Sequence, residues 1–167
     1  MNYNNYQNPR SKNNQQQDYS QNGGKKECED RISVNDFFSN LQFKAEWVSI
    51  GADEEMVNFA EKAGKYMAPT NKQDKQALTK SQIRNVFGEI KRINLKGFDT
   101  IEGKSSFMLL KPKVAYAEGR NRSMGLSLFK KIFDSSWKYV SDQKTYQNFC
   151  NLIEAILAYH KAFGGKD

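Results

Sequence analysis

The segment from Leu78 to Ile93 contains the clearest helix start in the sequence. Thr79 followed by Gln82 is the capping-box pattern, in which two side chains satisfy free amides at the beginning of a helix. Apolar side chains then recur at the 3.6-residue spacing of one helix face. The apolar positions are Ile83, Val86, Phe87, Ile90 and Ile93. The segment therefore predicts a helix with one side in a core, which requires other elements to pack against it.

The other periodic segments also predict helices. Asp53 is expected to cap a helix that Pro69 stops, and residues 124–140 form a second apolar stripe. Asp142 is expected to cap a longer helix that ends near Phe163 and, with the broadest apolar face, lies at the centre of the bundle. The sequence has no alternating strand pattern and no internal repeat. The predicted fold class is all-α, a single compact bundle of about five helices.

The segment between these helices is harder to interpret. Residues 94–103 contain two glycines and are predicted to form a loop, with the next helix beginning near Ser105 or Ser106. Pro112 is expected to kink or restart that helix, because proline lacks an amide donor and clashes with the preceding turn. Gly119 is the natural residue to end it.

The amino-terminal part differs in composition from the rest of the chain. Asn, Gln and Tyr make up fifteen of residues 1–24, and such a segment cannot bury enough apolar surface to offset its ordering entropy. We therefore predict a disordered Asn/Gln-rich tail over residues 1–30 and a helical bundle domain over residues 31–167. Within the domain, residues 32–50 are expected to form an extra helix or a docked arm.

Several functional classes find no support in the sequence. It has no apolar run long enough to cross a membrane and no signal peptide, so we expect a cytoplasmic location. Cys28 and Cys150 are too few for a disulfide framework or a zinc site and are expected to be reduced. His160, the only histidine, falls beside an apolar helix face without an evident acid or nucleophile partner. We therefore expect no catalytic residues, no metal and no cofactor.

The net charge of +7 is unevenly distributed, because residues 78–122 hold ten basic and four acidic side chains. A basic excess concentrated in one stretch indicates an anionic partner, most often nucleic acid. Arg84 and Lys91 lie seven residues apart on one predicted helix, and Lys113 and Arg120 repeat this spacing on the next. Seven residues advance a helix by roughly 10 Å, which suits the distance between phosphates on an extended strand.

These rows and their neighbours define a candidate surface for contacts with nucleic-acid phosphates. Its candidate residues are Lys80, Arg84, Lys91, Lys111, Lys113, Arg120 and Arg122, with Tyr116 as the candidate for stacking on a base. Other interpretations stay open. Rows of cations also occur on solvated helix edges, and a cation at a helix end, such as Arg120, complements the carbonyl groups there. Tyr116 also suits a place in the core.

Three stretches resemble the small subunit of type III-A CRISPR effector complexes, the Csm small subunit. They are TKSQIRNVFGEIKRI, FMLLKPKVAYAEGR and FCNLIEAILAYHKAFGG, and the resemblance extends from about Ala52 to Gly165. The family implies a non-catalytic, all-helical protein whose copies stack along a ribonucleoprotein filament in prokaryotic antiviral defence. It also implies other Csm-type subunits, crRNA and target RNA as partners, the RNA duplex being contacted through basic side chains. The tail and residues 32–50 cannot be matched to these motifs.

Two functions of other classes fit parts of the sequence. A helix-turn-helix-like protein that binds double-stranded DNA would use the Thr79 helix for recognition, although Asn85 is nearly the only base-reading residue there. A helical adaptor that binds only protein would show no salt-dependent affinity for nucleic acid. The three functions differ in the macromolecule that is bound.

Overall fold

Seven α-helices make up the regular structure of residues 31–165, the part of the chain that the computed structural model describes. They are α1 (Val34–Leu41), α2 (Glu46–Ser49), α3 (Glu54–Met67), α4 (Lys80–Lys96), α5 (Ile101–Arg120), α6 (Met124–Trp137) and α7 (Gln143–Ala162). The all-α class is confirmed for these residues. Helices α3 to α7 correspond to the five predicted helices, and α1 and α2 lie in segment 32–50. The predicted tail, residues 1–30, lies outside the described residues, as does Cys28.

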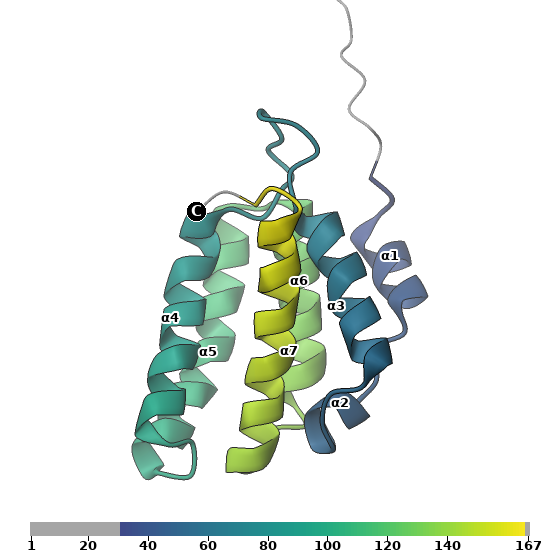
Figure 1. Ribbon diagram of the computed structural model, residues 1–167. Coiled ribbons are helices and arrows are strands. Elements are labelled where there is room, and N and C mark those ends of the chain that lie inside the picture. Colours follow the sequence, from purple (N-terminus) through teal and green to yellow (C-terminus); the bar gives the residue numbers. More distant parts are fainter. Residues whose placement is uncertain (1–30, 166–167) are drawn as a thin grey trace, which may run out of the picture. The chain divides into compact units, whose positions relative to one another are not determined.

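Helix α7 lies in the middle of the bundle, with α3 on one side of it and α4 and α5 on the other (Figure 1). Its inward face is fully buried, including Phe149, Ile153 and Ile156. His160 is also buried, and its Nε2 lies 3.0 Å from the carbonyl oxygen of Leu78. The central position of the last helix and the core placement of the histidine are thus confirmed.

The predicted helix starts are confirmed by their capping hydrogen bonds. The backbone amide of Thr79 donates to the Gln82 side chain at 2.8 Å in the capping box of α4. The Asp53 carboxylate accepts from a first-turn amide of α3 at 2.7 Å, and that of Asp142 does the same in α7 at 2.8 Å. These contacts involve residues three positions apart, which explains why the sequence alone predicts them.

The loop predicted over residues 94–103 is wrong in its extent. Helix α4 continues to Lys96, and α5 begins at Ile101 rather than near Ser105, with the Thr100 hydroxyl accepting from the Gly103 amide at 2.9 Å. Only four residues separate the two helices, because Thr100 supplies a cap that the glycine-based interpretation overlooked.

The two glycines of this segment have a packing role. An added Cβ at Gly103 would lie 2.2 Å from the carbonyl oxygen of Gly97, so the first turn of α5 touches the backbone of the connection directly. Phe98, which lies between the two glycines in the sequence, is buried and stacks on Tyr146 of α7 at a ring-centroid distance of 4.9 Å. The two glycines therefore permit the first turn of α5 to approach the backbone of the connection closely, whereas the sequence predicted a longer loop.

Helix α5 departs from its prediction at Gly119, and at Pro112 it shows no restart, which was one of the two outcomes expected there. It continues through Pro112 without a restart, and Gly119 lies inside its last turn instead of ending it, since Asn121 is the C-cap. Buried Leu110 and Val114 anchor the helix on both sides of the exposed proline. Tertiary packing on one face thus holds the helical backbone despite the missing amide donor.

Two features considered from the sequence, the thiol of Cys150 and membrane-spanning helices, can be compared with the structure. Cys150 is a buried free cysteine, and burial raises the pKa of its thiol to about 11. Among residues 31–165, no helix has the length and apolar character needed to cross a membrane.

The connection between α3 and α4, residues 68–79, is organised around Asp74. The carboxylate of Asp74 accepts hydrogen bonds from the amides of Thr70 at 3.0 Å and Gln76 at 2.8 Å, and pairs with Arg31 at 2.7 Å. Its side chain is only 7% exposed. Burial by itself would raise the pKa of Asp74, but the hydrogen bonds and the charge of Arg31 together hold it below the ordinary 3.8.

Replacing Asp74 with Asn is expected to lower the free energy of unfolding by about 1.5–3 kcal/mol, because the charge that pairs with Arg31 is lost and an NH2 group replaces one of the two acceptor oxygens. The folded-state pKa is depressed, so this stabilisation is complete above the unfolded-state pKa of about 4 and disappears as pH falls through the folded value. Urea unfolding of wild type and Asp74→Asn at neutral pH and below about pH 3 measures the effect. An equal difference at both pH values would contradict a role for the charge.

Candidate nucleic-acid interface

The basic segment, residues 78–122, consists mainly of α4 and α5, which pack against each other as antiparallel neighbours (Figure 1). The start of α4 meets the end of α5, where the Gln82 side chain donates to the carbonyl oxygen of Asn121 at 2.9 Å. The beginning of α6 joins them, because the Gly125 amide donates to the Gln76 carbonyl at 2.8 Å. We call this region, residues 68–84 and 120–125, the loop end of the bundle.

Most cations of the basic segment already have partners. Carboxylates pair with Lys91, Arg92, Lys96, Lys104, Lys113 and Arg122, and Lys111 lies over the Trp137 ring at 4.7 Å. In the described part of the chain, no carboxylate lies within ion-pair distance of the remaining three, Lys80, Arg84 and Arg120. All three lie at the loop end. Charges without a local partner are the ones available to an external anion.

The helix ends at the loop end contribute potentials of both signs, because the amino ends of α4 and α6 are positive and the carboxyl end of α5 is negative. Neither α4 nor α6 has an acidic residue in its first turn, although acids are favoured there. Helix α4 instead begins with Lys80 and has Arg84 one turn later, a placement that costs stability because it sets cations against the positive end of the dipole. An anion bound near these amides and side chains would relieve that repulsion.

The two seven-residue rows flank α4 on different sides. Lys91 reaches α7, where it pairs with Glu154, and the helical period places Arg84 on the same side. Lys113 and Arg120 line a groove on the other side of α4, between it and α5. Helix α4 therefore lies between the two rows.

The groove between α4 and α5 has a volume of about 910 Å³ and brings three of the candidate residues together, Lys113, Tyr116 and Arg120. Tyr116 is 69% exposed, which excludes the core position that the sequence had left open. Asn85 faces Tyr116 from α4 as part of the same lining. The sequence named Asn85 only as a possible base-reading residue for DNA, because its place in this groove depends on which face of α4 meets α5.

Glu89 sets the charge balance at the inner end of the groove. A hydrogen bond from Arg92 is the main cause that lowers the pKa of Glu89, and the charge of Lys113, whose Nζ lies 3.5 Å away, adds to it. The carboxylate therefore stays ionised and offsets part of the charge of both cations. Lys113 is thus partly neutralised, whereas Arg120 has no carboxylate partner among the described residues.

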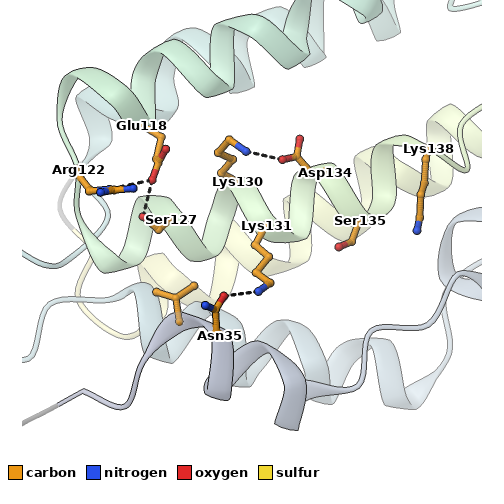
Figure 2. A pocket seen from close by; sticks show the side chains of 10 residues that line it. Asn35, Glu118, Arg122, Ser127, Lys130, Lys131, Asp134, Ser135 and Lys138 are labelled. Carbon is orange, nitrogen blue, oxygen red and sulfur yellow. Dashed lines mark hydrogen bonds and ion pairs between the residues drawn. The ribbon is translucent and has the colours of Figure 1, made fainter.

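A second hollow, of about 520 Å³, lies between α1, the end of α5 and α6 (Figure 2). The candidate residue Arg122 lines this hollow, where Glu118 holds it at 3.4 Å, and not the groove. Lys130 pairs with Asp134 at 2.6 Å, while Lys131 contacts the side-chain oxygen of Asn35. These α6 lysines were not among the candidates named from the sequence, because the charge excess of their segment is small.

Residues 31–165 contain no group of three or more His, Cys, Asp or Glu side chains that could hold a metal ion.

Comparison with known proteins extends these observations. A family model described as Csm2 Type III-A matches residues 52–166. A curated relative from Streptococcus thermophilus, named "CRISPR system Cms protein Csm2", is 32% identical over 124 residues, which cover 72% of this chain and all of the relative. The matched region begins just before α3, so α1 lies outside the family match.

Proposed function

The chain belongs to the Csm2 family of type III-A CRISPR systems, and we propose that it contacts the crRNA–target RNA duplex as a non-catalytic small subunit of the effector complex. In this role its partners are crRNA, target RNA, other Csm-type subunits and neighbouring copies of itself along the filament. The function is antiviral defence in the prokaryotic cytoplasm.

The observation that carries the RNA contact is the group of loop-end cations without a carboxylate partner among residues 31–165, namely Lys80, Arg84 and Arg120. Phosphate contacts of this kind position a strand without reading its sequence. That suits a complex in which base pairing with the guide selects the target. Arg120 also extends the surface into the groove, where Lys113 supplies a second cation.

Weaker RNA contacts are expected from Lys91, Lys111 and Arg122. Each of the three has a partner in the structure. The side chains of Lys91 and Arg122 are nevertheless 48% and 82% exposed. Exposed ion pairs contribute little stability, so a phosphate can replace the carboxylate at small cost. We therefore rank Arg84 and Arg120 above these residues as RNA contacts.

The test is the double variant Arg84→Ala with Arg120→Ala in the assembled complex. We expect weaker binding of target RNA, about equally for unrelated sequences, because phosphate contacts are sequence-independent. The slope of log affinity against log salt should decrease by roughly 0.7–0.9 for each phosphate that is no longer neutralised. Binding titrations over a range of salt concentrations measure both quantities.

The matched control is the double variant Lys62→Ala with Lys144→Ala. It removes the same charge from exposed lysines that lie outside the loop end and the groove. The control should change the salt slope much less than the arginine variant. If the arginine variant assembles normally and binds with unchanged affinity and slope, the RNA contact is refuted and a protein-only role for this surface follows.

A further inference from the structure

Helix α5 exposes apolar side chains opposite its buried stripe. Leu109 is 57% exposed and Tyr116 is 69% exposed, and both line the groove together with Pro112. The spacing of these three residues places them on one side of the helix, so they form a continuous apolar wall. Ligand sites usually combine an apolar surface of this kind with a few polar groups.

The polar groups of the groove have unused hydrogen-bonding capacity. The carboxamide of Asn85, the hydroxyl of Tyr116 and the guanidinium of Arg120 have no hydrogen-bond partner among the described residues. Gln82, by contrast, is held by two hydrogen bonds, because it accepts from Thr79 and donates to Asn121. The groove therefore presents a free amide on α4 opposite an exposed aromatic ring on α5.

The positions along α5 place a cation on each side of the ring. Lys113 precedes Tyr116 by three residues and Arg120 follows it by four, which corresponds to about 4.5 and 6 Å along the helix axis. The acid of the lining, Glu89, is held by Arg92 and Lys113. A ligand whose flat group stacks on the Tyr116 ring can thus place one negative group near Lys113 and another near Arg120.

We propose that the groove between α4 and α5 binds one unpaired nucleotide of an RNA strand, with its base stacked on Tyr116. Asn85 hydrogen-bonds to the edge of the base, and Lys113 and Arg120 contact the phosphates that flank it. This inference rests on the proposed function and adds a contact to a base to the phosphate contacts at the loop end.

The chemistry of the groove favours an unpaired base over a duplex. Bases within a duplex already stack on their neighbours, whereas unpaired bases of RNA stack on aromatic side chains and offer their edges to amides. The groove volume of about 910 Å³ lies within the range of small-ligand sites, so a single nucleotide fits.

The experiment uses the full chain and an oligouridylate with one central 2-aminopurine, a base whose fluorescence decreases on stacking. Titration with wild-type protein should quench the fluorescence. Tyr116→Phe retains the ring and should quench as wild type does. Tyr116→Leu should abolish the quenching and bind about tenfold more weakly, within the range known for a base stacked on an aromatic residue.

Two further arms separate a base contact from a general effect of charge. Asn85→Ala should weaken binding of the probe without changing its salt slope, because a neutral contact releases no counterion. The same 2-aminopurine within a fully paired RNA duplex should show no quenching that depends on Tyr116. Melting temperatures of the Tyr116 variants should equal that of wild type, since the side chain is mostly exposed.

The proposal is overturned if wild type does not quench the single-stranded probe, or if Tyr116→Leu quenches it as wild type does. This failure is distinguishable from failure of the proposed function. If the double variant Arg84→Ala with Arg120→Ala still lowers the salt slope of the assembled complex, the phosphate contacts stand even when the nucleotide site is refuted. Absence of both effects refutes both proposals.

Discussion

Replacing Phe149 with alanine is expected to lower the free energy of unfolding by about 3–5 kcal/mol. Phe149 is 0% exposed on the central helix α7. Its ring makes edge contacts with Phe107 at a centroid distance of 5.7 Å and with Phe133 at 5.5 Å. The substitution removes these contacts from α5 and α6 at once and leaves a cavity that the surrounding helices can fill only in part.

Urea unfolding monitored by circular dichroism measures this decrease, with Leu95→Ala as the control. Leu95 is 88% exposed, so its truncation should change the free energy of unfolding by no more than about 0.5 kcal/mol. Truncation of Ile153 or Ile156, which are also fully buried, should cost about 2–5 kcal/mol. A Phe149→Ala effect below about 1 kcal/mol would mean that the inward face of α7 is wrongly assigned.

The second large effect is expected at Gly64, where α3 crosses α7. An added Cβ there would lie 2.6 Å from the Cβ of Tyr159, 2.7 Å from the amide nitrogen of His160 and 2.9 Å from the carbonyl oxygen of Ile156. Two of these atoms belong to the backbone of the central helix, which cannot yield without separating the two helices. Gly64→Ala should therefore cost about 3 kcal/mol, the upper end of the usual range for overpacking.

Gly88→Ala is the matched control for Gly64→Ala. Gly88 lies on α4, and an added Cβ there would meet no atom within 4 Å. Alanine is the better helix former by about 1 kcal/mol, so this variant should be more stable than wild type. The same chemical change is thus expected to have opposite signs at the two glycines, and chemical denaturation of both variants measures it. Equal effects would contradict the close crossing of α3 and α7.

Helix starts and core faces were predictable because their causes are local. A capping box such as Thr79 with Gln82 involves residues three positions apart, and an apolar stripe repeats every turn. The sequence therefore determined the all-α class, the positions of α3, α4, α6 and α7, and the burial of Phe149. The same locality explains why Lys80, Arg84 and Arg120 could be named as candidates.

Tertiary structure decided the ion-pair partners of Lys91 and Lys113, whereas Arg122 pairs with Glu118 only four residues away. Lys91 pairs with Glu154, 63 residues away, and Lys113 pairs with Glu89 across the α4–α5 contact. Those partners depend on how the helices pack, which no local pattern contains. Packing likewise decided that Tyr116 lies in a groove. The sequence by itself determined where helices form and where positive charge concentrates. The packing of the helices decided the partners of Lys91 and Lys113, because an ion pair requires two side chains to meet in space, whatever their separation along the chain.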